Sequence, residues 1–303
     1  MTINETCGQS AIAFLEAHGV DTVFGIPGVH TLDFYKGLSN SRIRHIGVRH
    51  EQGAGFMADG YARASGKPGV CVLITGPGVV NAGTAIGQAF SDSVPMLVLS
   101  SVNGSEDLGK GRGRLHEITD QQAVMAPLTA FSRTILKPDE LTQAMADAYA
   151  VFETGRPRPV HIEIPIDVLA GQGVSAVDTR GRRQRPVAEP AALSEAARLI
   201  DGAKRLVVIA GGGALEAGDT LKTFVEKSGA VLIPTVAGRG ILRRSSAEPG
   251  WNTGARSNAE AAGRKRCRGR RRDRTGGDRS LDQTPADQRQ ADPHRSRSAH
   301  IDA

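Results

Sequence analysis

The carboxylate of Glu51 is the group whose surroundings point most directly to chemistry. It stands in Arg49-His50-Glu51-Gln52-Gly53-Ala54, between an apolar segment expected to form a strand and a Gly- and Ala-rich segment expected to form a helix. The N–H groups and the dipole at the start of a helix stabilise a carboxylate. Taken alone, Glu51 is therefore most simply interpreted as a helix-terminal charge, and its neighbours must decide whether it does more.

Two other loops have the glycine-rich character of a binding site. Gly25-Ile26-Pro27-Gly28 and Thr75-Gly76-Pro77-Gly78 each follow an expected strand. Open α/β sheets bind ligands at the carboxyl ends of their strands, so these two loops and Glu51 could converge. Glycine lets the backbone approach a flat ring closely, and Asn81, in the helix after the second loop, could add an amide contact. The pattern favours a site for a flat ring beside a carboxylate.

The elements that would position these residues alternate between strand and helix over residues 1–170. Runs of β-branched residues separated by helical segments indicate an α/β fold with a doubly wound parallel sheet. The expected strands are 20–26, 43–48, 69–75, 96–100 and a closing strand at 160–164. The expected helices are 6–18, 31–38, 51–64, 80–91, 119–126 and 139–153.

The composition changes after residue 170. Residues 171–190 are rich in Gly, Arg, Gln and Pro, without a periodic apolar pattern, and we interpret them as a linker. A second α/β domain is expected over 191–242, with helices at 192–203 and 217–228 and strands at 205–210 and 230–234. These elements are too few to cover both faces and edges of a sheet. We therefore expect this second domain to be truncated.

Residues 243–303 differ in charge and hydropathy from the rest of the chain. They carry 15 Lys and Arg against 8 Asp and Glu, whereas residues 1–242 carry 23 against 24. Of the residue types Val, Ile, Leu, Met and Phe, this tail contains only Leu281 and Ile301. So few apolar side chains cannot offset the entropy of ordering the backbone. The tail is expected to be disordered.

The cysteines and the N-terminus indicate a cytoplasmic protein. Cys7, Cys71 and Cys267 are far apart and form no CxxC pair, so neither a disulfide framework nor a zinc site is indicated. The N-terminus lacks a basic region followed by an apolar core, and no apolar run approaches the roughly 18 residues of a membrane span.

An ordered set of motifs resembles one enzyme family. The segment from Arg49 to Ser100, the Pro27-Gly28 loop, Asp92-Ser93-Val94-Pro95 and Arg158-Pro159-Val160-His161-Ile162-Glu163 are similar to the pyrimidine-binding domain of acetolactate synthase-like thiamine diphosphate enzymes. The resemblance runs from about Thr6 to Leu242. Within the family, Gly113-Arg114-Leu115-His116-Glu117 is more similar to the 5-guanidino-2-oxopentanoate decarboxylase branch than to the biosynthetic synthases.

The resemblance implies a role for each matching residue. Glu51 would be the catalytic carboxylate, because it would drive the aminopyrimidine ring of the cofactor into its imino tautomer. Val29 and His116 would lie near the substrate, a 2-oxo acid, and His116 stands where synthases of this family commonly have Gln. A histidine there could act as a hydrogen-bond donor or a base, although an exposed loop histidine is the equally simple interpretation. The residues that would shape the pyrimidine pocket are Pro27, Gly28, Thr75, Pro77, Gly78 and Asn81.

The same resemblance implies groups that this sequence does not show. The family holds the diphosphate and Mg²⁺ through a Gly-Asp-Gly motif and a later Asn in a third domain, and the motif does not occur here; Gly218-Asp219-Thr220 and Gly277-Asp278-Arg279 lack its last glycine. No metal ligand is therefore assigned, and only the pyrimidine half of the site is expected. Gly211-Gly212-Gly213 opens the central domain, which holds FAD in some members, but Glu216 stands where a dinucleotide motif requires glycine.

Three hypotheses about function follow. The first is a thiamine diphosphate enzyme broken by a frameshift near codon 243 and inactive alone. The second is a pyrimidine-domain subunit that works with a separate diphosphate-domain chain. The third is a binding protein whose Arg264 to Arg274 segment contacts nucleic acid, which the interleaved Asp273 and the scarcity of aromatic residues disfavour. The family resemblance also implies a homodimer formed through the pyrimidine domain.

Overall fold

The computed structural model describes residues 5–174 and 186–242. The chain divides after Glu189 into two compact units. The disordered basic tail and the frameshift expected over 243–303, including Cys267, lie outside the described residues.

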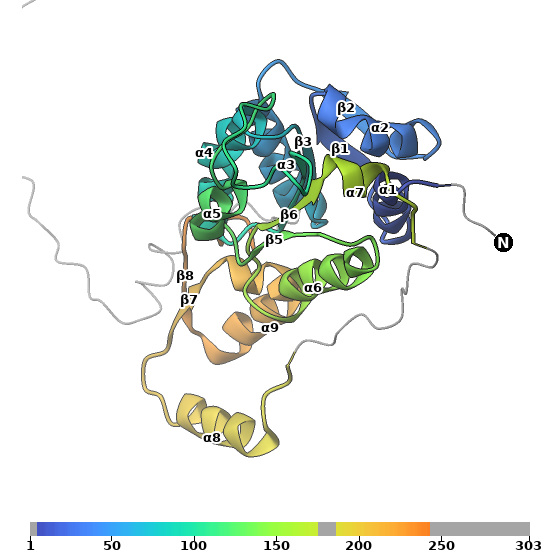
Figure 1. Cartoon of the computed structure of the whole chain (residues 1–303). Coiled ribbons are helices and arrows are strands. Elements are labelled where there is room, and N and C mark those ends of the chain that lie inside the picture. Colours follow the sequence, from blue (N-terminus) through green and yellow to red (C-terminus); the bar gives the residue numbers. More distant parts are fainter. Residues whose placement is uncertain (1–4, 175–185, 243–303) are drawn as a thin grey trace, which may run out of the picture. The chain divides into compact units, whose positions relative to one another are not determined.

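The first unit is an α/β fold built on a parallel six-stranded sheet, as the sequence predicted (Figure 1). The strand order is β2-β1-β3-β4-β6-β5, and every pairing is parallel. The strands are β1 (Thr22–Gly25), β2 (Arg44–Gly47), β3 (Gly69–Leu73), β4 (Met96–Val102), β5 (Ser132–Thr134) and β6 (Val160–Pro165).

Helices cover both faces of this sheet. One face carries α1 (Cys7–Ala17), α2 (Leu32–Ser39), α6 (Glu140–Thr154) and α7 (Ile166–Ala170). The other face carries α3 (Glu51–Ser65), α4 (Pro77–Asp92) and α5 (Gln121–Met125). Two short 3₁₀ turns, η1 (Val29–Thr31) and η2 (Ala126–Leu128), complete the unit. No helix in the described parts of the chain is long and apolar enough to cross a membrane.

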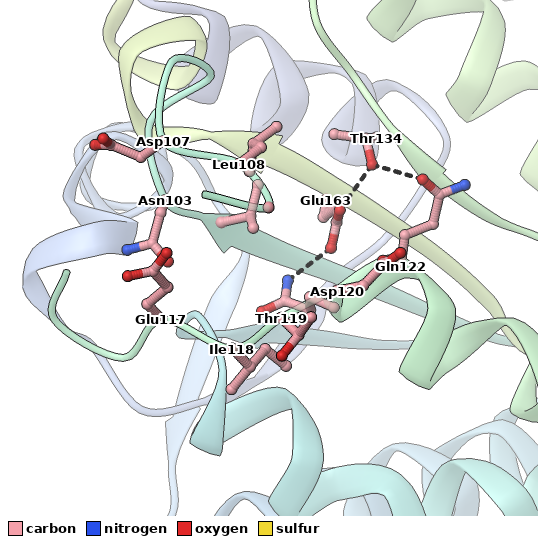
Figure 2. Close-up of a pocket in the computed structure, with 13 residues that line it drawn as sticks. Asn103, Asp107, Leu108, Glu117, Ile118, Thr119, Asp120, Gln122, Thr134 and Glu163 are labelled. Carbon is pink, nitrogen blue, oxygen red and sulfur yellow. Dashed lines mark hydrogen bonds between the residues drawn. The ribbon is translucent and has the colours of Figure 1, made fainter. Parts of the chain in front are cut away.

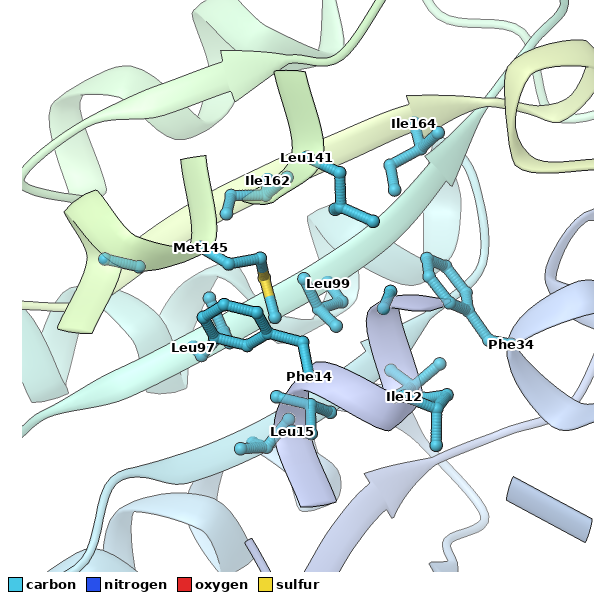
Figure 3. Packing of buried hydrophobic residues seen from close by; sticks show 14 of the residues in the cluster. Ile12, Phe14, Leu15, Phe34, Leu97, Leu99, Leu141, Met145, Ile162 and Ile164 are labelled. Atoms are coloured by element: carbon cyan, nitrogen blue, oxygen red, sulfur yellow. The ribbon is translucent and has the colours of Figure 1, made fainter. Parts of the chain in front are cut away.

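The central strands feed two separate cores because successive side chains of a strand point to opposite faces. In β3, Val70 and Val72 pack in the core under α1, while Cys71 and Leu73 pack in the core under α3 and α4. Figure 3 shows the first core, where Phe14 and Leu15 of α1 meet the sheet beside Leu97. This burial on both faces explains why the central strands read as continuous apolar runs.

Local sequence signals fix several helix ends. Thr6 caps α1 through a capping box with Gln9, in which each side chain accepts a hydrogen bond from the other's backbone N–H. Gly66 ends α3 with φ of 73°, a conformation that glycine adopts without strain. Pro77 begins α4, a position where its missing N–H costs nothing.

The structure corrects three sequence-based expectations. Helix α4 begins at Pro77, not at residue 80, so Pro77 and Gly78 form its first turn. Strand β5 was not predicted, because three residues of sequence Ser-Arg-Thr have no apolar pattern. Strand β6 was expected to close the sheet, but it lies between β4 and β5, and β5 is the edge.

In the second unit, the described residues form a small α/β arrangement. Strand β7 (Val207–Ala210) pairs in parallel with β8 (Val231–Pro234). The helical elements are α8 (Pro190–Asp201), η3 (Gly212–Ala217) and α9 (Gly218–Ser228). Ile209 is 71% exposed and Ile233 50% exposed, so apolar strand surface remains open among these residues.

Strand pairing leaves no room for a side chain at Gly25, where β1 meets β3. A Cβ at Gly25 would overlap the carbonyl oxygen of Val72, its partner in the register. We expect Gly25→Ala to lower the free energy of unfolding by about 1–3 kcal/mol, because the sheet must shift to accept the methyl group. Urea denaturation followed by circular dichroism measures the change.

The matched control is Gly60→Ala, which adds the same methyl group to the middle of α3, where a Cβ would meet no atom within 4 Å. This change should stabilise the protein by up to about 1 kcal/mol through helix propensity. Equal effects of the two substitutions would contradict the close approach of β1 and β3.

Candidate functional site

The candidate site lies where the sheet changes its winding direction. After β1 the chain passes through α2 on one face to β2, and after β3 it passes through α4 on the opposite face to β4. The loops that leave the neighbouring strands β1 and β3 therefore separate at their carboxyl ends. In open α/β sheets, such a switch point is where ligands bind. The Pro27-Gly28 loop, Glu51 and the Gly76 turn follow β1, β2 and β3, which are neighbours in the sheet.

Glu51 is the first residue of α3, and its side chain is oriented by Asn81 of α4. Asn81 Nδ2 donates a hydrogen bond of 2.9 Å to Glu51 Oε2. In the described part of the chain no hydrogen bond is formed to Oε1, which remains available as an acceptor. Glu51 is half-buried and Asn81 is exposed. The pair predicted from separate motifs is thus assembled as one polar unit that opens to solvent.

The Gly28 and Gly78 positions form a floor beside this unit. A Cβ at Gly28 would overlap the end of the Ile74 side chain, and a Cβ at Gly78 would lie 2.5 Å from another carbon of Ile74. The Gly78 position also lies 3.5 Å from Glu51 Oε1. Side chains there would fill the space next to the free carboxylate oxygen. Ile74 between the two glycines was not predicted as a site residue, because an aliphatic residue at a strand end gives no signal of its own.

The Gly76 turn is held by groups behind it. Gly76 has φ of 60°, and a Cβ there would overlap the carbonyl oxygen of His116. The Thr75 side chain is buried and shares a hydrogen bond of 3.1 Å with Ser101 Oγ. Its hydroxyl is therefore directed to β4, and its backbone faces the turn. His116 itself has φ of 57°, which is uncommon for a non-glycine residue.

A buried amide connects this turn to the far strands of the sheet. Gln121 of α5 accepts a 2.6 Å hydrogen bond from the Gly76 N–H through Oε1. Its Nε2 atom donates to Ser100 Oγ and the Ser101 carbonyl oxygen at 3.0 Å and to Glu163 Oε2 at 2.8 Å. The amide is thus satisfied at both ends. Gln121 belongs to the segment that resembles the decarboxylase branch, but the sequence indicated no site role for it, because a lone Gln in a short helix has no distinguishing pattern.

Glu163 and His161 of β6 complete the buried network. Thr134 Oγ1 donates 2.7 Å to Glu163 Oε1, and burial raises the pKa of Glu163 despite this bond and the one from Gln121. The His161 ring lies between Ser100 Oγ at 2.8 Å and Ser132 Oγ at 2.7 Å. Burial lowers the pKa of His161 to about 3. Both side chains are therefore held in the neutral form more strongly than in water.

A cavity of about 270 Å³ lies next to this network (Figure 2). Glu163 and Thr134 form one side of it, and Asp107 and Glu117 of the loop after β4 form another. Its carboxylates already have partners within the described residues. Asp107 pairs with Arg112 at 2.8 Å and Arg114 at 2.9 Å, and both oxygens of Glu117 accept backbone N–H groups. We therefore regard this cavity as part of the loop's framework.

The substrate residues expected from the sequence differ in exposure. Val29 is 61% exposed in η1, at the mouth of the Pro27-Gly28 loop. His116 is half-buried, and its ring lies 5.9 Å from the ring of His30, at an angle of 89°. His30 is 9% exposed; it follows Val29 directly and was not predicted. Among the described residues no group of three or more His, Cys, Asp and Glu could hold a metal.

Comparisons with known proteins agree with this arrangement. Residues 5–124 match the family described as "Thiamine pyrophosphate enzyme, N-terminal TPP binding domain". Residues 193–264 match "Thiamine pyrophosphate enzyme, central domain". This second match extends past Leu242, where the resemblance was expected to stop.

Several curated proteins are similar to the chain. It is 58% identical over 241 residues to the "Probable 2-ketoarginine decarboxylase AruI" of Pseudomonas aeruginosa, covering 78% of this chain and 43% of the relative. It is 39% identical over 217 residues to a "Probable acetolactate synthase large subunit" of Methanocaldococcus jannaschii, covering 69% of this chain and 36% of the relative. It is 36% identical over 245 residues to the "Acetolactate synthase isozyme 1 large subunit" of Escherichia coli, covering 79% and 43%. The chain thus matches about two fifths of the length of these relatives.

The buried imidazole of His161 predicts a pH dependence of stability. An unfolded histidine has a pKa near 6.5, whereas folding lowers the pKa of His161 to about 3. The contribution of His161 to the free energy of unfolding is complete above pH about 6.5. It is lost as the pH falls towards 3, because in this range only the unfolded chain takes up the proton. Glu163 changes the free energy of unfolding in the opposite direction. Because its pKa is raised on folding, it stabilises the folded state as the pH falls.

The measurement is the free energy of unfolding in urea at pH 7 and pH 5, in wild type and in His161→Gln. Wild type should lose about 2 kcal/mol more than the variant over this interval. His18→Gln, which changes a partly exposed ring at the end of α1, is the control and should keep the wild-type pH dependence. The same pH dependence in His161→Gln as in wild type would contradict the assignment.

Proposed function

The chain belongs to the thiamine pyrophosphate enzyme family through its N-terminal and central domains, and on this premise we propose that it binds the pyrimidine ring of thiamine diphosphate at Glu51. The observation that carries the proposal is the Asn81–Glu51 hydrogen bond at the switch point of the sheet. It orients one carboxylate oxygen and leaves the other as an acceptor for a ring nitrogen.

The residues around Glu51 suit a flat heterocycle. The floor formed by Gly28, Ile74 and Gly78 has no space for further side chains, so the backbone lies close to whatever is bound there. When bound, thiamine diphosphate supplies a nucleophilic carbon and an electron sink for 2-oxo acid chemistry. In the proposal, the chain's own contribution is to hold the ring against Glu51, to accept or donate a proton at Glu51 Oε1, and to place His116 near the substrate.

We propose a 2-oxo acid decarboxylase of the 2-ketoarginine type as the function. It is supported by the 58% identity to the Pseudomonas aeruginosa relative named for this activity, against 34–39% for the acetolactate synthases. His116, in the loop over Gly76, supports the same choice because the resemblance places Gln there in synthases. The second candidate is an acetolactate synthase-type enzyme, which uses the same pyrimidine site to join two 2-oxo acids.

The diphosphate end of the cofactor and Mg²⁺ need groups other than those described here. Mg²⁺ prefers oxygen ligands in octahedral geometry, and the described residues offer no such cluster. We propose that these groups come from outside the described residues, which supply the pyrimidine side of the site. For FAD, the Gly211-Gly212-Gly213 segment leads into η3 after β7, and we propose no flavin role for it.

A homodimer formed through the first unit is also proposed. Large apolar side chains are 41–61% exposed around the candidate site. They come from η1 and α2, from α3 and α4, and from the loop and helix that follow β4. Covering them would remove apolar area from water and would enclose the open Glu51–Asn81 pair. These side chains are Val29, Leu32, Phe56, Met57, Val80, Leu115 and Val124.

Replacement of Glu51 tests the proposal against the helix-charge interpretation. Glu51→Gln keeps the size of the side chain and an oxygen that can accept from Asn81, but it removes the charge. We expect thiamine diphosphate to bind roughly 10- to 100-fold more weakly, since a hydrogen bond to a charged group contributes about 1.5–3 kcal/mol. Isothermal titration calorimetry gives the dissociation constant.

Glu140→Gln is the matched control, because Glu140 is the exposed first residue of α6 just as Glu51 is the first residue of α3. It should leave thiamine diphosphate binding unchanged while costing a similar helix-dipole contribution. If both variants bind the cofactor as wild type does, Glu51 is a helix-terminal charge and the proposed site is wrong.

A further inference from the structure

His30 is a buried histidine whose polar atoms are not fully used. It is 9% exposed, and its Nδ1 atom has no hydrogen-bond partner among the described residues. A buried polar atom without a partner costs about 1–3 kcal/mol. Such an atom beside a ligand site deserves a functional explanation, because packing alone would favour an apolar side chain there.

The His30 ring is placed by the loops of the candidate site. It lies in η1, two residues after Gly28, and the Thr31 hydroxyl fixes this turn by accepting from the Gly28 N–H and donating to the Gly28 carbonyl, both at 3.0 Å. The ring meets His116 edge to face at 5.9 Å. The His116 carbonyl oxygen in turn lies against Gly76. The two imidazoles therefore join the loop after β1 to the loop after β4, whose backbone lies against the Gly76 turn after β3.

Few other charges act on this pair. Strand β4, which packs against η1, has no titratable side chain between Met96 and Val102. On α2, Asp33 is ion-paired with Lys36 at 2.8 Å. In the loop of His116, both carboxylate oxygens of Glu117 accept backbone N–H groups. Burial first, and the charge of His116 second, lower the pKa of His30, so the ring is held neutral beside a more exposed imidazole.

We propose that His30 and His116 form a proton-handling pair, in which His116 delivers a proton to the substrate and His30 is the positioning residue that orients it. The inference rests on the proposed 2-oxo acid decarboxylase function. It gives a role to His30, which the sequence motifs do not indicate. It also explains why a second imidazole lies beside His116.

The chemistry of decarboxylation requires such a proton. The bond between C1 and C2 of the 2-oxo acid breaks, carbon dioxide leaves with C1, and the electron pair stays at C2. A proton from water then forms the C2–H bond of the aldehyde, so one proton is consumed in each turnover. In carbon–carbon ligation the electron pair at C2 instead attacks a second 2-oxo acid, and the proton ends on the new hydroxyl oxygen. A proton donor aimed at C2 therefore favours aldehyde over the ligation product.

The first experiment follows the histidine ring signals by NMR during a pH titration of the chain without cofactor. Wild type is compared with His116→Asn, chosen because Asn tolerates the positive φ of position 116, and His30→Asn identifies the His30 signal. The pKa of His30 should rise in His116→Asn, because a like charge has been removed. The signal of His161, which lies outside this pair, should behave as in wild type. An unchanged pKa of His30 overturns the coupling of the two rings and with it the inference.

The second experiment measures products from 2-ketoarginine with thiamine diphosphate, Mg²⁺ and any required partner chain present. His116→Asn should lower kcat for the aldehyde product by about 100-fold or more, with less effect on KM, and raise the ratio of ligation product to aldehyde. His30→Asn should lower the same kcat less and displace its pH profile, which loss of packing alone would not do. Wild-type turnover with an unchanged product ratio and pH profile in both variants overturns the inference alone. No wild-type turnover and no cofactor binding overturn the proposed function as well.

Discussion

The reversal of winding between β1 and β3 is the constraint on which the site depends. These adjacent parallel strands are followed by helices on opposite faces, and the chain runs to opposite sides of the pair, from β1 to β2 and from β3 to β4. This is the switch-point arrangement at which open α/β sheets bind ligands. The backbones of β1 and β3 lie very close to each other where Gly25 is paired with Val72. Glu51 is brought to the same edge because β2 pairs with β1 on its other side.

The network behind the Gly76 turn makes this edge rigid. Gln121 binds the turn at one end of its amide and Glu163 at the other, so a loop on β3 is connected to strand β6 through a side chain of α5. Inside the protein these bonds are stronger than in water, and an unpaired member would be costly. The network also holds His116, because the His116 carbonyl lies on Gly76. The residues proposed for the cofactor side and for the substrate side therefore share one support.

The sequence predicted the fold class and the elements that have a strong apolar period, such as α3 and β4. It also indicated Glu51, Asn81 and the glycines as candidates, because a carboxylate after a strand and glycine at a turn are local signals; the structure places Asn81 and Gly78 beside Glu51, and their role in binding stays a prediction. It did not predict β5, whose stability comes from pairing with β6 rather than from its own three polar residues. Ile74, Gln121 and His30 were missed for a related reason: each acts through contacts with residues distant in the sequence, and no local pattern records those contacts.

The exposure of the candidate site is the reason for proposing that another surface covers it. A carboxylate perturbs a ring nitrogen most strongly where water is excluded, yet Glu51 is half-buried and Asn81 exposed. The apolar residues Phe56 and Val80 lie on the helices that carry this pair and are 44% and 47% exposed. A surface that covered these two side chains would bury their apolar area and would also exclude water from the Glu51–Asn81 hydrogen bond. In the proposed function the chain would contribute the oriented Glu51 carboxylate and the His30–His116 pair, and the covering surface would lower the dielectric around them.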